Sequence, residues 1–368
     1  MPASPCPPSG PLAGLKVVEF QAIGPVPLAG MLLSDLGADV VCIARPNGVP
    51  NDPRAITSRG RRWTELDLKA PQDVGKARAL MAQADVVLEG LRPGVMERLG
   101  LGPETALADN PKLVYGRMTG WGQDGPLAQQ AGHDINYIAI TGALDSFRGA
   151  DGVPVPPLNL VGDYGGGAMF LLTGILSAVF AARGSGLGQV VDAAMCDGVV
   201  ALLSLFHMRA AMGQWHEPGH NVLDGGAHYY GVYRCADGRF MSVGAIEPQF
   251  HAELLRTLGL EPEIAERQSA RDGWPALKAR MAEIFATRTQ AEWTRLFEGS
   301  DACVAPVVSL KDAPDHPHLK ARGTFVTRDG VVQANAAPRF SHTPSAVRDL
   351  PRIAVDAQEI ANAWAVQT

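Results

Sequence analysis

Three acid–base side chains stand in glycine-bordered turns along this sequence of 368 residues. His133 lies in the stretch AGHDINY, Asp163 in LVGDYGGG and Glu247 in GAIEPQF. One imidazole and two carboxyl groups can accept and donate protons, so the three types together suit acid–base chemistry at a carbon atom. They are the candidate catalytic residues of the chain.

Each of the three also has a simpler structural explanation. A lone histidine is most often a hydrogen-bonded core residue, Asp163 is suited to cap the apolar helix that follows it, and Glu247 suits an exposed helix start. The glycines after Tyr164 argue against a plain cap, because each weakens a helix by about 1 kcal/mol relative to alanine. Bare backbone there indicates a close approach, for which a bound ligand is one good reason.

Several motif look-alikes fail on their context. WHEPGH (residues 215–220) matches the HExxH zinc signature, but Pro218 and Gly219 break the helix that a zinc pair needs. The glycines of residues 162–167 do not spell the dinucleotide fingerprint after the first strand, and no phosphate-binding P-loop pattern occurs. The five cysteines show no nucleophile motif. We therefore expect no metal, no nucleotide cofactor and no cysteine chemistry.

Composition excludes further classes of function. Hydrophobic residues make up 46% and charged residues 19%, with a net charge of −6, so nucleic acid and anionic membranes are not expected partners. The longest apolar run, residues 168–182, is shorter than the ~20 residues that a membrane helix needs. The unpaired cysteine pattern and a start without a signal-peptide pattern predict a reducing, cytoplasmic location.

Strand-like and helix-like segments alternate through the first half of the chain. This alternation predicts an α/β fold with a doubly wound, Rossmann-like parallel sheet. The expected strands are residues 15–20, 39–44, 63–68, 85–88, 112–116 and 189–195, and the expected helices are residues 26–36, 71–83, 103–108 and 168–182.

The pattern changes after about residue 215. Residues 229–233 and 240–243 flank CADGR, which predicts a β-hairpin, and helices are expected at residues 274–287 and 289–299. We therefore expect a large domain over residues 1–215, completed by residues 325–368 with a helix at 356–365. A smaller α+β domain with linkers occupies residues 216–324.

Ordered motifs over most of the chain resemble the class III CoA-transferase superfamily (CaiB-BaiF) and, within it, the α-methylacyl-CoA racemase branch. The similarity runs from about Gly10 to Ser341. The motifs are GPLAGLKVVEF (residues 10–20), LLSDLGADVV (32–41), Arg45-Pro46, ELDLK (65–69), RPGVMERLGLG (92–102), GRMTGWGQDGP (116–126) and AGHDINY (131–137).

The resemblance implies an isomerase that interconverts (2R)- and (2S)-2-methylacyl-CoA thioesters by removing and returning the α-proton. His133 and Asp163 would be the two bases on opposite sides of the α-carbon, and Glu247 would orient the histidine. The family's fold is an interlocked homodimer, so Glu247 would act on His133 of the other subunit. No cofactor is implied beyond the CoA thioester itself.

This two-base chemistry sets two requirements on the protein. Asp163 must be protonated part of the time, so apolar burial, with Tyr164 and Met169 nearby, should raise its pKa. The enolate oxygen needs donors placed in advance, and we expect the main-chain N–H groups of residues 163–167 to supply them.

The resemblance also assigns the residues that bind the CoA thioester. The basic ones are Arg45, Lys69, Arg92 and Arg98. Leu66, Asp67 and Leu68 would lie near the adenosine, and Gly90 and Leu91 along the chain of the CoA. The remaining substrate-binding residues are Gly132, Asp134, Ile135, Asn136 and Tyr137. The basic cluster of Arg59, Arg61 and Arg62 is expected to add to the positive field, without a specific contact.

Three other functions compete with racemisation. A CoA-transferase of the same fold would use Asp163 as the nucleophile that forms an anhydride, but the histidine of the GHD stretch belongs to the racemase pattern. A catalytically idle acyl-CoA-binding protein would not need His133, Asp163 and Glu247 together. An NAD-dependent dehydrogenase lacks its fingerprint at residues 21–27.

Overall fold

The computed structural model describes residues 9–149 and 151–366, so the proline-rich start of the chain with Cys6 lies outside the described residues. The chain divides into two compact units. The large unit comprises Met1–Thr141, Pro157–Leu203 and Pro317–Thr368, and the small unit comprises Gly142–Pro156 and Ser204–His316. The domain bounds at residues 215 and 324 remain a prediction, since compactness alone does not establish an independent domain.

The large unit is built on a sheet of six parallel strands in the order β3-β2-β1-β4-β5-β6. This is the order of a doubly wound α/β fold, as the alternating sequence pattern predicts. The strands are β1 (Lys16–Phe20), β2 (Asp39–Ala44), β3 (Arg61–Glu65), β4 (Val86–Glu89), β5 (Val114–Thr119) and β6 (Gln189–Ala194).

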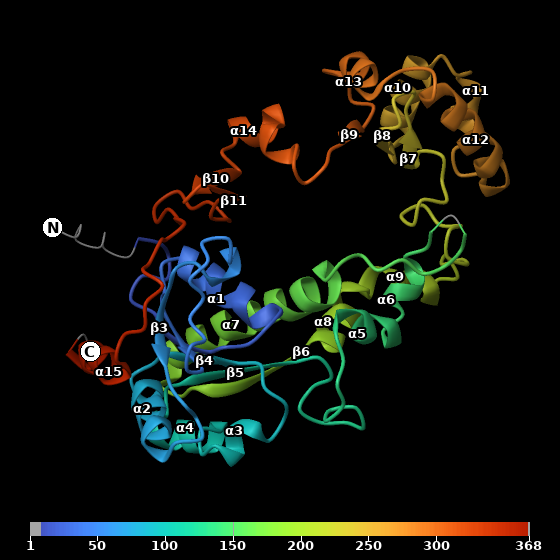
Figure 1. Ribbon diagram of the computed structural model, residues 1–368. Helices are drawn as coiled ribbons and strands as arrows, with labels where there is room; N and C mark the ends of the chain where they lie inside the picture. Colours follow the sequence, from blue (N-terminus) through green and yellow to red (C-terminus); the bar gives the residue numbers. More distant parts are fainter. Residues whose placement is uncertain (1–8, 150, 367–368) are drawn as a thin grey trace. The chain divides into compact units, whose positions relative to one another are not determined.

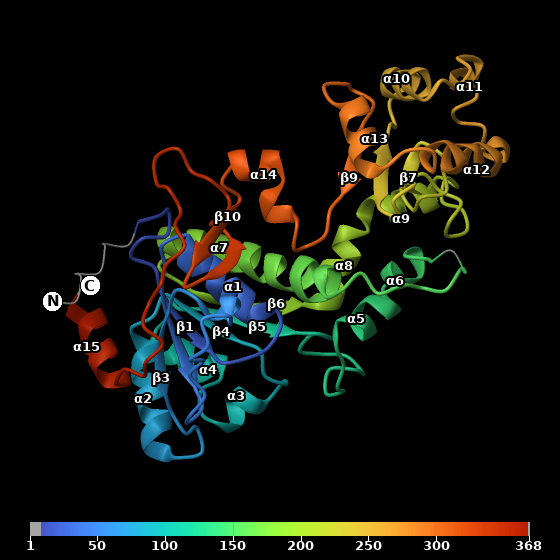
Figure 2. The same ribbon diagram turned by 45° about the horizontal axis from the view of Figure 1, so that its top comes forward.

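Helices cover both faces of this sheet (Figures 1 and 2). Because neighbouring strand residues point to opposite faces, Val17 faces one hydrophobic core and Val18 the other. The helices of the large unit are α1 (Pro25–Asp35), α2 (Pro71–Ala82), α3 (Val95–Arg98), α4 (Pro103–Asp109), α5 (Asp134–Ile140), α7 (Met169–Ser185), α8 (Met195–Leu202), α14 (Pro317–Ala321) and α15 (Ala357–Val366), with the 3-10 turn η1 (Ile56–Ser58) and the π-helix η2 (Leu160–Ala168).

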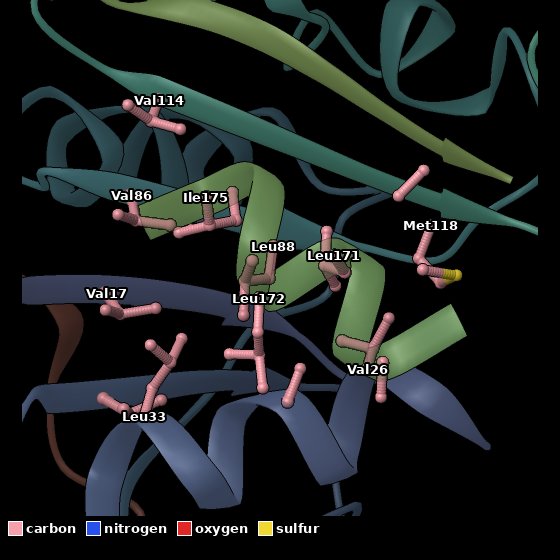
Figure 3. Close-up of a cluster of buried hydrophobic side chains, with 14 of the residues drawn as sticks. Val17, Val26, Leu33, Val86, Leu88, Val114, Met118, Leu171, Leu172 and Ile175 are labelled. Carbon is pink, nitrogen blue, oxygen red and sulfur yellow. The ribbon is translucent and has the colours of Figure 1, made fainter. Parts of the chain in front are cut away.

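The first core packs α1 and α7 against the sheet (Figure 3). Leu33 of α1 and Leu171 and Ile175 of α7 meet strand residues such as Val86. By length and composition alone, the helical run Leu160–Ser185 could cross a membrane, and core helices of globular proteins pass the same test. Since Leu171 and Ile175 are fully buried, one face of this run forms part of the core.

The second core lies on the opposite face and includes residues from a distant part of the chain. Leu80 of α2 and Trp364 of α15 pack there with Tyr115 of β5. The indole Nε1 of Trp364 donates to Asp39 Oδ2 at 2.7 Å, and Lys16 Nζ donates to the Trp364 carbonyl at 2.7 Å. Helix α15 is therefore attached to the first two strands of the sheet.

Two strands, β3 and β5, differ by two or more residues at both ends from their predicted bounds, and both contain buried arginines. β3 begins at Arg61, whose guanidinium lies 2.7 Å from Glu19 on β1, and both side chains are buried. β5 continues past Gly116 to Thr119, because Arg117 pairs with the buried Glu89 at 3.0 Å. A prediction from hydrophobicity leaves an arginine outside a buried strand. In the structure, a carboxylate on another strand of the sheet pairs with the arginine, so the strand can include it.

The small unit contains a three-stranded antiparallel sheet in the order β7-β8-β9. The predicted hairpin is confirmed, since β7 pairs with β8 antiparallel across the CADGR turn. Its strands are β7 (Tyr230–Arg234), β8 (Phe240–Gly244) and β9 (Val304–Val307), and its helices are α6 (Ala143–Ser146), α9 (Ser204–Ala211), α10 (Pro248–Leu258), α11 (Glu263–Glu266), α12 (Trp274–Phe285) and α13 (Gln290–Phe297), with the 3-10 turn η3 (Arg271–Gly273).

Aromatic side chains fill the core of the small unit. Tyr233 of β7 stacks on Phe285 of α12 with ring centroids 5.0 Å apart, and Trp293 of α13 lies 5.0 Å from the same Phe285. Three further elements complete the secondary structure. The 3-10 turn η4 (Ala313–Asp315) lies at the end of the small unit, and the antiparallel hairpin of β10 (Phe325–Arg328) and β11 (Val331–Ala334) lies in the C-terminal part of the large unit.

Candidate active site

A cavity of about 360 Å³ opens at the carboxyl ends of the parallel strands in the large unit. Ligands of doubly wound sheets bind where neighbouring strands connect in opposite directions, which here is between β1 and β4. Residues 23–26 after β1 and residues 90–93 after β4 line the cavity. The strand order thus fixes where this site must be. His133 and Asp163 both line it.

His133 is an exposed residue immediately before α5. The side chain of Asn136 accepts the His133 N–H at 3.0 Å, and the hydroxyl of Tyr137 donates to the Gly132 carbonyl. Trp121 packs edge-to-face on Tyr137 with ring centroids 4.7 Å apart. The backbone around His133 is therefore held in place while its imidazole lines the cavity.

Gly132 is required by this packing. A Cβ atom at Gly132 would lie 2.8 Å from Cε1 of Tyr137, closer than real Cβ contacts come. The glycine before His133 therefore lets the tyrosine ring lie under the turn. Tyr137 is itself largely buried, and burial raises the pKa of its hydroxyl, with the Asp163 charge as a further cause.

Asp163 lies in η2, half-buried, with its carboxylate at the cavity. The amide of Asn159, one residue before η2, donates to Asp163 Oδ2 at 3.1 Å. Gly24 lies opposite, since a Cβ there would be 3.0 Å from the same oxygen. Burial raises the pKa of Asp163, and the charge of Asp134 raises it further, while the Asn159 hydrogen bond and His133 oppose the shift. This is the direction that a two-base reaction requires.

The glycine segment around Asp163 differs from the predicted turn. It is a π-helix, and Asp163 does not cap α7, which begins at Met169. The prediction of free N–H groups at residues 163–167 was also wrong for the first two of them. The Asp163 N–H donates to Asp134 Oδ2 at 2.7 Å, and the Tyr164 N–H donates to the Asn159 carbonyl in π-helical fashion. These N–H groups already have acceptors inside the protein.

Helix packing, rather than a ligand, explains the bare backbone of η2. A Cβ atom on Gly198 of α8 would lie 2.0 Å from the Gly166 carbonyl oxygen, and one on Gly166 would lie 2.6 Å from Val199 Cγ2. The backbones of η2 and α8 are therefore in direct contact, and only glycine allows this approach. The close approach was expected, but its partner is another helix of the same chain.

The residues assigned to CoA occupy the loops at the carboxyl ends of the strands. Gly90, Leu91 and Arg92 follow β4 and line the cavity. Arg45 follows β2, the stretch 66–69 follows β3, and Arg98 ends α3. Arg45, Lys69, Arg92 and Arg98 are all exposed, and none of them forms an ion pair within residues 9–149 and 151–366.

Not every assigned residue faces solvent. Leu66 is 3% exposed and packs in the second core, whereas Leu68 is partly exposed and Asp67 is exposed. Ile135 and Asn136 are exposed on the first turn of α5. Asp134 is buried, and it is absent from the cavity lining because its carboxylate faces the Asp163 backbone.

The basic cluster near β3 has a structural role, so its predicted contribution to the positive field at the site was wrong. Arg59 pairs with Asp35 and Arg61 with Glu19, and all four side chains are buried. Arg62 pairs with Asp39 at 2.6 Å. Three positive charges close together in sequence are thus neutralised by three carboxylates from other elements.

Comparison with known proteins identifies the family. The pattern that defines CoA-transferase family III matches residues 12–353. The chain belongs to CoA-transferase family III.

Within the family, named racemases are among its similar relatives. The chain is 46% identical to the alpha-methylacyl-CoA racemase of Mus musculus, over 92% of this chain and 89% of the relative. It is 43% identical to the alpha-methylacyl-CoA racemase of Homo sapiens, over 91% and 87%. The crystal structure of a CAIB/BAIF family protein from Brucella suis aligns with a TM-score of 0.80 at 26% identity, over 97% of this chain and all of that one.

The third candidate of this family III chain, Glu247, lies in the small unit. It precedes α10, is exposed and makes no capping hydrogen bond through its side chain. His133 and Asp163 lie in the large unit. The large-unit pair is therefore brought to one cavity, while a partnership between Glu247 and His133 stays a prediction.

Sequence reasoning overlooked two residues of the site. Asn159 stands four positions before Asp163, the spacing at which helical side chains meet, so its contact was open to prediction once a helix was assumed. Gly24 has a φ of 69°, which favours glycine, and it lies in the loop after the first strand, immediately before α1. Its position beside Asp163 depends on a fold that joins residues 139 positions apart.

The zinc look-alike WHEPGH is not helical in this family member. Residues 214–216 are irregular and residues 218–219 form a turn, in agreement with the sequence argument. Across residues 9–149 and 151–366, no group of three or more histidine, cysteine or acidic side chains is placed to hold a metal ion.

Proposed function

We propose that this chain interconverts the (2R) and (2S) epimers of 2-methylacyl-CoA thioesters by 1,1-proton transfer. The observation that carries the proposal is that an imidazole and a carboxyl group of raised pKa line one cavity, at the carboxyl ends of a doubly wound sheet. The names of the relatives support the same activity. The fold alone would not support this activity, since the relatives of this chain also include a CoA-transferase.

The proposed reaction moves one proton across one carbon. One base takes the α-proton, and the electron pair of the C–H bond moves into the thioester carbonyl to give an enolate. The acid on the other side then donates its proton to the same carbon, which inverts the configuration. His133 takes or gives the proton on one face and Asp163 on the other, and reversing the reaction exchanges the two roles.

Each direction requires one protonated and one unprotonated group at the start. A carboxyl group of ordinary pKa is almost fully ionised at neutral pH and is a poor proton donor. Burial at the cavity raises the pKa of Asp163, so a larger fraction carries the proton. The amide of Asn159 holds one carboxyl oxygen and fixes the orientation of the group. Proton transfer between these two side chains needs no metal or redox cofactor.

The CoA part of the substrate is proposed to bind along the loops after β2, β3 and β4. Phosphate groups call for exposed cations, and Arg45, Lys69, Arg92 and Arg98 supply four that form no ion pair with the part of the chain that the structure describes. Arg92 also lines the cavity, so it can bridge the CoA binding surface and the reacting end of the thioester. We place the reaction in the cytoplasm, in keeping with free cysteines at positions 42, 196, 235 and 303.

An interlocked homodimer in which Glu247 orients the partner subunit's His133 is part of the proposal. Large apolar side chains on the large unit are exposed, notably Phe180 at 83% and Leu187 at 65%. Apolar surface of this kind marks interfaces. Mixing inactive His133→Ala and Glu247→Ala subunits should restore activity in the heterodimer, and no recovery in a purified heterodimer would contradict shared sites.

Deuterium exchange tests the central claim. In heavy water, each epimer of a 2-methylacyl-CoA should exchange its α-proton without any added acid. Exchange that starts only when a free carboxylic acid is supplied would favour the CoA-transferase alternative, in which Asp163 forms an anhydride. A protein that binds the thioester and exchanges nothing in either case would be the idle acyl-CoA-binding form.

A further inference from the structure

We propose that Asp134 is a positioning residue for Asp163. The buried carboxylate of Asp134 holds the backbone of Asp163 in place. The inference deepens the racemase proposal and rests on it. It also replaces a direct substrate contact of Asp134 with an indirect role, since the side chain is absent from the cavity lining.

The contact is short and enclosed. Asp134 Oδ2 accepts the N–H of Asp163 at 2.7 Å, across 29 positions of sequence, and Asp134 is only 8% exposed. A hydrogen bond from an N–H to an ionised carboxylate is about twice as strong as a neutral one. Burying a carboxylate without a hydrogen-bond partner also costs free energy. This contact therefore holds both the Asp134 carboxylate and the Asp163 backbone in place.

Gly162 shows that the approach is built into the sequence. A Cβ atom at Gly162 would lie 2.5 Å from Asp134 Oδ2 and 2.8 Å from Asp134 Cγ. Any other residue before Asp163 would push the Asp134 carboxylate away. The φ of Gly162 is not in the left-handed region, so this crowding, rather than backbone strain, calls for glycine.

The position of Asp134 links the two proposed bases. It follows His133 directly and is the first residue of α5, where the helix dipole favours a negative charge. The dipeptide His133-Asp134 therefore carries one proposed base, the imidazole of His133, and holds the main chain of the other, Asp163. A shift of α5 would move both groups together, which keeps their separation constant.

The charge of Asp134 also acts on the Asp163 carboxyl. It is one of the causes that raise the pKa of Asp163, after burial, and His133 acts in the opposite direction. The charge of Asp163 in turn adds to burial in raising the pKa of the Tyr137 hydroxyl on α5. His133, Asp134 and Tyr137 all lie within residues 133–137. An asparagine at position 134 would keep an acceptor for the N–H and remove only the charge.

Three variants separate the contact from the charge. Asp134→Asn keeps the acceptor, Asp134→Ala removes both, and Gly162→Ala displaces the carboxylate while leaving its charge. Glu104→Gln is the matched control, because Glu104 is an exposed carboxylate in the first turn of α4, which has seven residues like α5. The readouts are α-proton exchange in heavy water from each epimer, as kcat and KM against pH, with thermal unfolding to confirm folding.

We expect Asp134→Asn to move the pH profile of kcat to lower pH for both epimers and to lower the neutral rate several-fold. Asp134→Ala should lose roughly 10- to 100-fold in kcat, the cost of a buried hydrogen bond to a charged group. Gly162→Ala should lose kcat without the acid shift. KM should change little in each, and Glu104→Gln should match the wild type.

Different results separate this inference from the racemase proposal. If the wild type exchanges neither epimer, the proposed function fails. If the wild type exchanges and a folded Asp134→Asn protein keeps its pH profile, or the main change falls on KM, the positioning role is wrong. If the Asp134 variants do not fold, Gly162→Ala decides, and full activity in that protein would overturn the proposal.

Discussion

The two proposed bases stand in opposite settings within one cavity. His133 is exposed at the start of the short helix α5, held by side chains of its own turn. Asp163 is half-buried inside a π-helix, with contacts to Gly24 and Asp134 from other segments and to Asn159 just before the helix. Proton transfer in both directions needs a carboxyl group that holds its proton part of the time, and burial raises the pKa of Asp163 in that direction.

The difference also concerns how each residue is fixed. The turn at His133 is closed by contacts within residues 121–137, whereas the place of Asp163 depends on the packing of η2 against α8. A change in the turn of residues 121–133 should therefore act locally. A change at the helix contact should alter stability as well as activity.

The largest expected effect comes from removing either base. Loss of a general acid or base costs roughly 10²- to 10⁴-fold in rate. His133→Ala should abolish proton removal from one epimer more than from the other, and Asp163→Ala should show the reverse preference. Exchange rates of the two epimers measure this directly. Equal losses from both epimers in both variants would contradict bases on opposite faces.

Gly198→Ala tests the helix contact beneath Asp163. A methyl group 2.0 Å from the Gly166 carbonyl oxygen must force the backbones apart, so we expect a loss of roughly 1–3 kcal/mol in stability and reduced exchange. Gly184→Ala is the control, because Gly184 lies in α7 with open space around its Cβ position. That variant should gain up to about 1 kcal/mol. Equal unfolding midpoints for the two variants would refute the packing account.

Asn159→Ala tests how the Asp163 carboxyl is tuned. The hydrogen bond from Asn159 lowers the pKa of Asp163, so its removal should raise this pKa and move the pH profile of exchange to higher pH. We expect a several-fold change in rate at neutral pH, in keeping with one lost hydrogen bond of roughly 1 kcal/mol. Asn335→Ala, at an exposed asparagine outside the cavity, should leave the profile unchanged. A shift to lower pH would contradict the assigned contact.

The smallest effect concerns stability. Because the pKa of Asp163 is raised in the folded state, the native protein binds this proton more tightly than the unfolded chain, and wild-type stability falls as pH rises through the folded pKa. Asp163→Asn cannot ionise. Its unfolding temperature should therefore exceed that of the wild type at pH 8, with a difference that shrinks toward pH 4. Thermal scans across this range measure it, and a difference independent of pH would exclude the linkage.

Much of the fold could be predicted because strands and helices leave a periodic pattern. The strand of residues 39–44 and the hairpin around CADGR were predicted correctly, because apolar alternation and an Asp-Gly turn are local signals. Arg61 and Arg117 broke the pattern, because their partners Glu19 and Glu89 lie on other strands. Pairing across a sheet cannot be read from one segment.

The residue types of the site could be predicted from the sequence, whereas the contacts that hold these residues in place could not. His133 and Asp163 were found because glycine-bordered acid–base groups are unusual, and the structure brings both to one cavity. The π-helix was missed because glycines argue against any helix, and contacts with distant segments, Gly162 with Asp134 and Gly166 with α8, explain two of them. The partnership of Glu247 with His133, which lie in different units of the chain, stays part of the proposal.

The anchoring of α15 has a consequence for how the large unit is made. Trp364 is buried beneath a sheet whose first strand begins at Lys16, and the two residues are joined by a hydrogen bond across 348 positions. One face of that sheet therefore stays partly uncovered until the ribosome has synthesised α15. A nascent chain of this protein should expose apolar surface for most of its synthesis and depend on chaperones that hold such surface.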